Sequence, residues 1–141
     1  MYILDTDHLT ALQRGGAHAQ RLLPRLDEVP PEEIAVTIVS VEEQLRGWLE
    51  EIHRARNPQA MIAPYTRLHD LILFFSAWPV VPFDEAARDE LVRLQKMRLR
   101  SIGPYDMRIA AICLANDATL LSSNLVDFSR IADLTVEDWL E

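Results

Sequence analysis

The stretch YILDTDHL, residues 2–9, places two carboxylates directly after a short apolar run. Its first three residues suit a β-strand, and Asp5 and Asp7 then follow within three positions. A turn after a strand needs one acidic residue at most, and no basic residue stands beside this pair. Neighbouring carboxylates repel each other, so the arrangement is costly unless a cation compensates their charge.

The rest of the chain alternates short β-prone runs with longer helical patterns. This alternation is typical of a parallel sheet covered by helices on both faces, and we expect an α/β fold. The expected strands are 2–4, 33–39, 80–83 and 118–122, with a last strand or extended tail within 133–140. The expected helices are two short ones within 10–26, one after Ser40 that ends at Asn57, one over 59–77, one capped by Asp84, one that starts after Gly103-Pro104, and a turn or two within 124–131.

Length and composition favour one globular unit over residues 1–141, because the chain is the size of one domain and 49% of it is hydrophobic. Repeats, low-complexity segments and linkers are lacking. No leader pattern and no membrane-spanning apolar stretch is visible, so we expect a soluble cytoplasmic protein with no membrane partner. The single cysteine, Cys113, lies among apolar residues and is interpreted as core.

The net charge of −8 argues against a nonspecific nucleic-acid coat, which needs many Lys and Arg residues. Five of the 14 Lys and Arg residues gather in one segment, RLQKMRLRSIGPYDMR, residues 93–108. Taken alone, this segment reads as a solvated helix face. If the protein binds a nucleic acid, Arg98, Arg100 and Arg108 are the candidates for contacts with its backbone.

Several acids lie where strands end or where the next helices begin, and in a parallel sheet these places meet at one edge. They are Asp5, Glu43, Asp106 and Asp127, with Asp7 as a fifth acid and Asn124 as an extra polar side chain. Capping offers a simpler explanation for some of them. Ser40 and Glu43 have the spacing of a capping box, and Asn124 and Asp127 repeat it. A helix dipole also favours Asp106 in a first turn. Capping does not explain the two carboxylates after the first strand, so the set together favours a shared site.

Oxygen ligands without thiols or paired histidines suit a hard ion, Mg2+ or Mn2+, better than zinc. The acids suffice for one ion or for a pair about 4 Å apart across a phosphate. Such a site hydrolyses phosphodiesters with a metal-activated water and needs no pair of histidines as acid and base. We accordingly interpret His8 as a surface or capping histidine rather than a substrate contact.

Four ordered motifs span nearly the whole chain: YILDTDHL, VSVEEQLRGW with Glu43 four residues before Gly47, IGPYDMRIAAICLAND around Asp106, and LLSSNLVDFSRI. Together they resemble the motifs of PIN-domain nucleases, specifically the VapC-type toxins of bacterial toxin–antitoxin pairs. The resemblance implies that Asp5, Glu43, Asp106 and Asp127 form the metal site. Thr6 and Ser122, with Asn124, would hold that site in shape.

The same resemblance implies a three-layer α/β/α sandwich with a mostly parallel sheet. The implied activity is endonucleolytic cleavage of RNA with Mg2+, for which Mn2+ substitutes. The implied partners are a second copy in a homodimer and a cognate antitoxin. One departure is that Asp7 stands where the family most often has Asn, which leaves open whether it alters metal affinity or substitutes as a polar ligand.

Other interpretations remain open on the sequence alone. A haloacid-dehalogenase-like phosphatase would use the DTD of residues 5–7, but Leu9 and the isolated Lys96 depart from that pattern. A noncatalytic acidic α/β binding module would use the acids as caps. The apolar helix around 68–78 is interpreted as core, with a dimer or antitoxin surface as the alternative.

Overall fold

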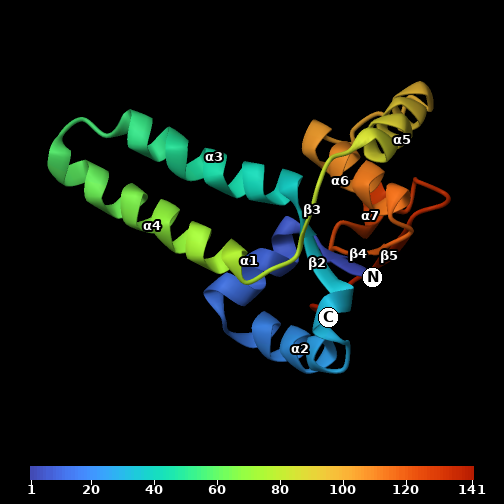
Figure 1. Cartoon of the computed structure of the whole chain (residues 1–141), viewed down its shortest axis with the longest axis horizontal. Coiled ribbons are helices and arrows are strands. Elements are labelled where there is room, and N and C mark those ends of the chain that lie inside the picture. Colours follow the sequence, from blue (N-terminus) through green and yellow to red (C-terminus); the bar gives the residue numbers. More distant parts are fainter.

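The computed structural model describes residues 1–141 and contains one five-stranded sheet with helices on both faces (Figure 1). The strands are β1 (Tyr2–Leu4), β2 (Ile34–Thr37), β3 (Val80–Val81), β4 (Thr119–Leu121) and β5 (Thr135–Glu137). The helices are α1 (Thr6–Arg14), α2 (Ala17–Asp27), the 3-10 turn η1 (Pro31–Glu33), α3 (Ile38–Arg54), α4 (Pro58–Ser76), α5 (Glu85–Lys96), α6 (Pro104–Ala115) and α7 (Leu125–Phe128). The predicted α/β/α sandwich is confirmed.

The sheet has the order β3-β2-β1-β4-β5, and every neighbouring pair is parallel, so it is wholly rather than mostly parallel. The chain builds outward from β1 through β2 to β3 and then returns to the other side of β1 as β4. The reversal makes β1 and β4 the switch point of the sheet, where ligand crevices form beyond the carboxyl ends of the strands.

Two apolar clusters form the core, one on each face of the sheet. Successive strand residues point to opposite faces, so Ile3 joins the cluster beneath α5 and α6, while Leu4 joins the cluster beneath α1, α2 and α4. Both side chains are fully buried, as is Cys113, which confirms its place in the core. Burial also raises the pKa of the Cys113 thiol well above its ordinary value.

The start of α3 differs from the prediction. The β-branched residues Ile38 and Val39 suit a strand, but β2 ends at Thr37 and both belong to the helix. The Thr37 hydroxyl caps α3 by accepting a hydrogen bond of 3.1 Å from the Ser40 N–H. The helix therefore begins at Ile38, whereas the sequence predicted a helix that starts only after Ser40.

The helices α3 and α4 form a hairpin that extends away from the sheet (Figure 1). The prediction that residues 68–78 are core is right for Leu71 and Phe75, which are buried, and wrong for Ile72 and Leu73, which are each 58% exposed. The hairpin packs on the sheet only near its base, so the outer side of α4 stays in solvent. No helix is both long enough and apolar enough to cross a membrane.

Candidate active site

The structure brings the predicted acids together beyond the carboxyl ends of β1 and β4. Asp5 directly follows β1 and is the N-cap of α1, and Ser122 directly follows β4. The remaining acids come from three helices: Glu43 from the second turn of α3, Asp106 from the first turn of α6 and Asp127 from α7. Residues more than 100 positions apart thus share one edge of the sheet.

Asp5 is the most deeply placed acid, with 5% of its surface exposed. Its two carboxylate oxygens accept hydrogen bonds of 2.8 Å, one from the Thr6 N–H and one from the Ser122 hydroxyl. Burial and then the charge of Asp7 raise the pKa of Asp5 to about 7. The protein therefore holds an acid whose ionised form is unfavourable without added positive charge.

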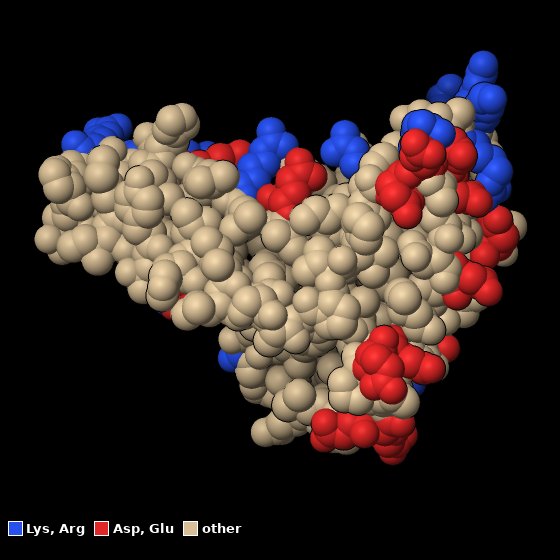
Figure 2. Space-filling model, in the orientation of Figure 1, with Lys and Arg blue, Asp and Glu red and all other residues tan.

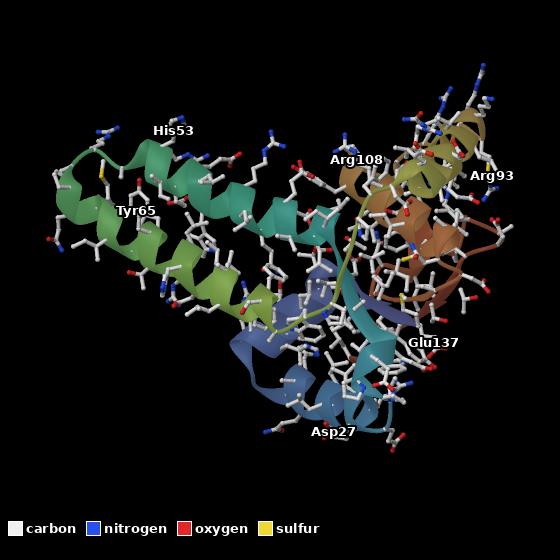
Figure 3. All side chains as sticks on the ribbon, in the orientation of Figure 1. Asp27, His53, Tyr65, Arg93, Arg108 and Glu137 are labelled. Atoms are coloured by element: carbon white, nitrogen blue, oxygen red, sulfur yellow. The ribbon has the colours of Figure 1, made fainter.

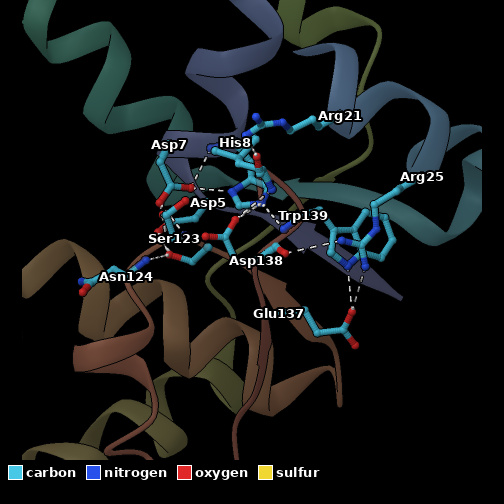
Figure 4. A network of polar contacts seen from close by, with 12 residues as sticks. Asp5, Asp7, His8, Arg21, Arg25, Ser123, Asn124, Glu137, Asp138 and Trp139 are labelled. Carbon is cyan, nitrogen blue, oxygen red and sulfur yellow. Dashed lines mark hydrogen bonds and ion pairs between the residues drawn. The ribbon is translucent and has the colours of Figure 1, made fainter. Parts of the chain in front are cut away.

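Asp7 lies in a dense hydrogen-bond network with His8 and the β4 end (Figure 4). One oxygen accepts from the backbone N–H of His8 at 2.6 Å and from its ring Nδ1 at 2.7 Å. The other oxygen accepts from the Ser123 N–H at 2.8 Å and the Ser122 hydroxyl at 3.3 Å. Burial alone would raise the pKa of Asp7, but the hydrogen bonds from His8 and Ser123 outweigh it and lower the pKa. Asp7 thus joins the end of β1 to the end of β4.

The interpretation of His8 as a surface or capping histidine is wrong, because its side chain is fully buried. The backbone N–H of Trp139 donates to the ring Nε2 at 3.1 Å, so Nε2 is the unprotonated nitrogen and Nδ1–H donates to Asp7. His8 therefore holds the C-terminal segment against the site. The partner that buries it lies 131 residues away, and no local pattern reveals it.

The other acids do not act as helix caps in the structure. Glu43 is too far along α3 to cap it, and it accepts a 2.6 Å hydrogen bond from the Thr6 hydroxyl. Asn124 makes no side-chain cap. Its amide instead donates to Asp127 at 3.1 Å and to Asp106 at 3.4 Å. The capping interpretation is wrong for Glu43 and for the Asn124–Asp127 pair.

No basic side chain forms an ion pair with Asp5, Glu43, Asp106 or Asp127. Burial, and then the charges of Glu43 and Asp127, raise the pKa of Asp106. The chain's ion pairs leave these acids out: they join His8 to Asp7 and Asp138 and arginines to acids elsewhere. Hard oxygen donors with an uncompensated charge suit a divalent cation such as Mg2+.

As the side chains stand, no three His, Cys, Asp or Glu residues are arranged to hold a metal ion together. The carboxylates accept hydrogen bonds from Thr6, Ser122 and Asn124 instead. The shared amide of Asn124 takes one oxygen of Asp106 and one of Asp127, which leaves the other oxygen of each for an ion. Carboxylate oxygens are suitable ligands for such an ion. In this structure the acidic side chains have the rotamers that form these hydrogen bonds.

Basic side chains flank the acids on α3 and α6. Arg46 lies three residues after Glu43 and donates a 2.5 Å hydrogen bond to the Tyr105 hydroxyl, and the Arg108 guanidinium lies 5.8 Å from the Tyr105 ring centre. Figure 3 shows Arg108 at the notch between α3 and α6. Arg46 was not among the predicted site residues, although its spacing from Glu43 places both on one helix face. Arg98 and Arg100 lie in the exposed turn between α5 and α6, outside this network, and their contact with RNA stays a prediction.

Comparisons with known proteins identify the family of the chain and similar folds. The family model of the PIN domain matches residues 2–134. A comparison with curated proteins finds no match.

The chain is similar to VapBC-1 from nontypeable Haemophilus influenzae, with 23% identity, 99% of this chain and 98% of that chain covered, and a TM-score of 0.77. It is similar to DNA-bound VapBC from Salmonella typhimurium, with 21% identity, 98% and 97% covered, and a TM-score of 0.77. FitAcB from Neisseria gonorrhoeae gives 22% identity, 98% and 97% covered, and a TM-score of 0.70. At these identities the likeness shows the fold.

Proposed function

The chain belongs to the PIN domain family, and we propose that it is a metal-dependent endoribonuclease that acts as the toxin of a toxin–antitoxin pair. One observation carries the proposal: acids from β1, α3, α6 and α7 converge on the switch point of the sheet with no basic partner. Hydrolysis of a phosphodiester is a chemistry that uses such a cluster together with a divalent cation.

The proposed ligands of the cation are Asp5 and Asp106, with Glu43 and Asp127 completing the site directly or through waters. The raised pKa of Asp5 and of Asp106 supports this assignment, because each acid gains from a cation placed between them. A bound Mg2+, or Mn2+ in its place, would supply the positive charge that activates water and stabilises the attacked phosphate.

The supporting residues orient these acids. The Ser122 hydroxyl and the Thr6 N–H each hold one oxygen of Asp5, so its carboxylate plane is set before a cation arrives. The Thr6 hydroxyl positions Glu43, and the Asn124 amide keeps Asp106 and Asp127 on the same side of the site. Both carboxylate oxygens of Asp7 accept hydrogen bonds, from His8, Ser122 and Ser123. We therefore assign Asp7 a supporting role and do not place it among the metal ligands.

The partners follow from the structural relatives, which include toxin–antitoxin complexes. We propose an RNA substrate, a cognate antitoxin protein and a homodimer. Exposed apolar side chains on α4, among them Ile62, Ile72 and Leu73, supply surface that a protein partner would cover. We further propose that residues 1–141 act as a single cytoplasmic nuclease domain, since the family model and the structural relatives cover nearly the whole chain.

A decisive test is cleavage of total cellular RNA by the purified protein with Mg2+ or Mn2+, beside EDTA and an Asp106→Asn variant purified in the same way. We expect discrete fragments that depend on the metal and disappear in both controls. Cleavage that survives in the variant would identify a contaminant. No cleavage by the wild-type protein under any metal condition would favour a noncatalytic binding module.

A further inference from the structure

A pocket of about 760 Å3 lies between α1, α3 and α4 and reaches the acid cluster at Thr6 and Glu43. These two residues are joined by the 2.6 Å hydrogen bond described above, so the pocket and the site share a wall. The volume is within the range of small-molecule and cofactor sites. A substrate that passes over the acids would meet this pocket next.

The pocket is lined by charged, amide and apolar side chains, among them the acids Glu43 and Asp70 and the apolar residues Leu71 and Phe74. Arg14 and Arg67 line it, and the arginine ion pairs of the chain belong to other residues: Arg25, Arg46, Arg54, Arg88 and Arg93. Gln13 donates a 2.7 Å hydrogen bond to Gln44, and this amide pair has further donors and acceptors free for a base edge. Trp48 adds an aromatic ring on which bases stack in single-stranded nucleic-acid sites.

Gly47 is the observation that points to an occupant. It lies inside α3, where glycine weakens a helix relative to alanine, and it lines the pocket. Its φ lies in the ordinary negative range, and a Cβ built at this position meets no atom within 4 Å. Neither backbone strain nor packing therefore requires glycine. Its missing side chain does keep the pocket open beside Trp48.

We propose that this pocket binds one nucleotide of the RNA strand next to the phosphate that is cleaved. The inference rests on the proposed nuclease function and assigns it a substrate subsite. Arg14 and Arg67, which have no ion pair, can contact a phosphate, and the amide pair and the Asp70 carboxylate can hydrogen-bond a base edge. The outer face of the hairpin is largely free of charge in Figure 2, so the α4 surface suits an apolar partner.

The test is to fill the pocket from Gly47. The Gly47→Phe variant adds an aromatic side chain into open space, and Leu49→Phe is the matched control, since Leu49 lies on the same helix, is 52% exposed and does not line the pocket. Both changes are made in the Asp106→Asn background so that RNA stays intact. Binding of a fluorescein-labelled, random-sequence 12-nucleotide RNA is measured by anisotropy with Mg2+.

We expect Gly47→Phe to weaken RNA binding roughly tenfold or more, the loss of one stacked base, and Leu49→Phe to change it by less than about twofold. The variant at position 47 should also remain folded by circular dichroism and keep the melting temperature of its background. If both variants bind RNA equally well, the pocket is not a nucleotide subsite.

A second variant keeps the test independent of folding at position 47. Arg67→Gln removes one exposed guanidinium of the pocket, and Arg54→Gln removes one near the far end of α3. The slope of log Kd against log salt should fall by about 0.7 for Arg67→Gln and stay unchanged for Arg54→Gln. Equal slopes would contradict a phosphate contact at Arg67. Failure of the nuclease function itself would appear separately, as wild-type protein that cleaves no RNA.

Discussion

Asp5→Asn should make the protein more stable while it removes a proposed metal ligand. The folded-state pKa of Asp5 is about 7 against an ordinary value of 3.8, a difference of about 3 units. At about 1.36 kcal/mol per unit, keeping this carboxylate ionised costs up to about 4 kcal/mol at pH 8. The amide can still accept from the Thr6 N–H and can donate to the Ser122 hydroxyl, so the local hydrogen bonds survive the change.

The sign of the pH dependence is a sharper check than the magnitude. The folded-state pKa is raised, so the folded protein binds more protons than the unfolded chain between about pH 4 and pH 7. The penalty is complete above the folded pKa and vanishes below the unfolded one. The advantage of Asp5→Asn should thus shrink from about 4 kcal/mol at pH 8 to below about 1 kcal/mol at pH 4.

The assay is urea unfolding in EDTA at equal protein concentrations across this pH range. Asp27→Asn serves as the control, since Asp27 is an exposed acid at the end of α2 and should change stability by less than about 0.5 kcal/mol. Adding Mn2+ should stabilise the wild type more than Asp5→Asn. A variant that is less stable than wild type at pH 8, or whose advantage does not decline in acid, would refute the reasoning about Asp5.

Three further changes probe the site and the core. Ser122→Ala should destabilise the protein by roughly 1.5–3 kcal/mol above pH 7 and by less in acid, because an ionised Asp5 loses its hydroxyl donor. The loss is measured by urea unfolding at pH 8 and pH 5, and equal losses at the two pH values would contradict this prediction. His8→Phe should cost about 2–5 kcal/mol and speed amide exchange at Trp139, whose N–H loses its acceptor, and unchanged exchange would show that His8 does not hold this segment. Leu22→Ala should cost about 2–5 kcal/mol by urea unfolding, because Leu22 is fully buried, and a loss under 1 kcal/mol would mean that α2 packs loosely.

Some features could be predicted because they depend on neighbours in the chain. The alternation of strand and helix patterns reflects local periodicity, so the α/β class and the order of elements were accessible. The cap of α5 by Asp84 is equally local, since the side chain accepts from the Ala87 N–H three residues on. Position at a strand end was enough to propose that Asp5, Glu43, Asp106 and Asp127 meet.

Other features were predicted wrongly or could not be predicted, because they depend on contacts with residues far away in the sequence. Local propensity extended β2 through Val39, but the Thr37 cap ends it earlier. The exposure of Ile72 and Leu73 depends on how far the hairpin projects from the sheet, which no helical pattern records.

The sequence by itself determined which elements form and which acids stand at their ends, because strand and helix preferences and capping act over a few residues. Only the tertiary structure decided what those acids contact. His8 is buried because Trp139 returns to it from the end of the chain, and Asp5 has a raised pKa because β4 and α1 close over it. Burial and through-space charge depend on which distant segments meet, and that is decided when the whole core packs.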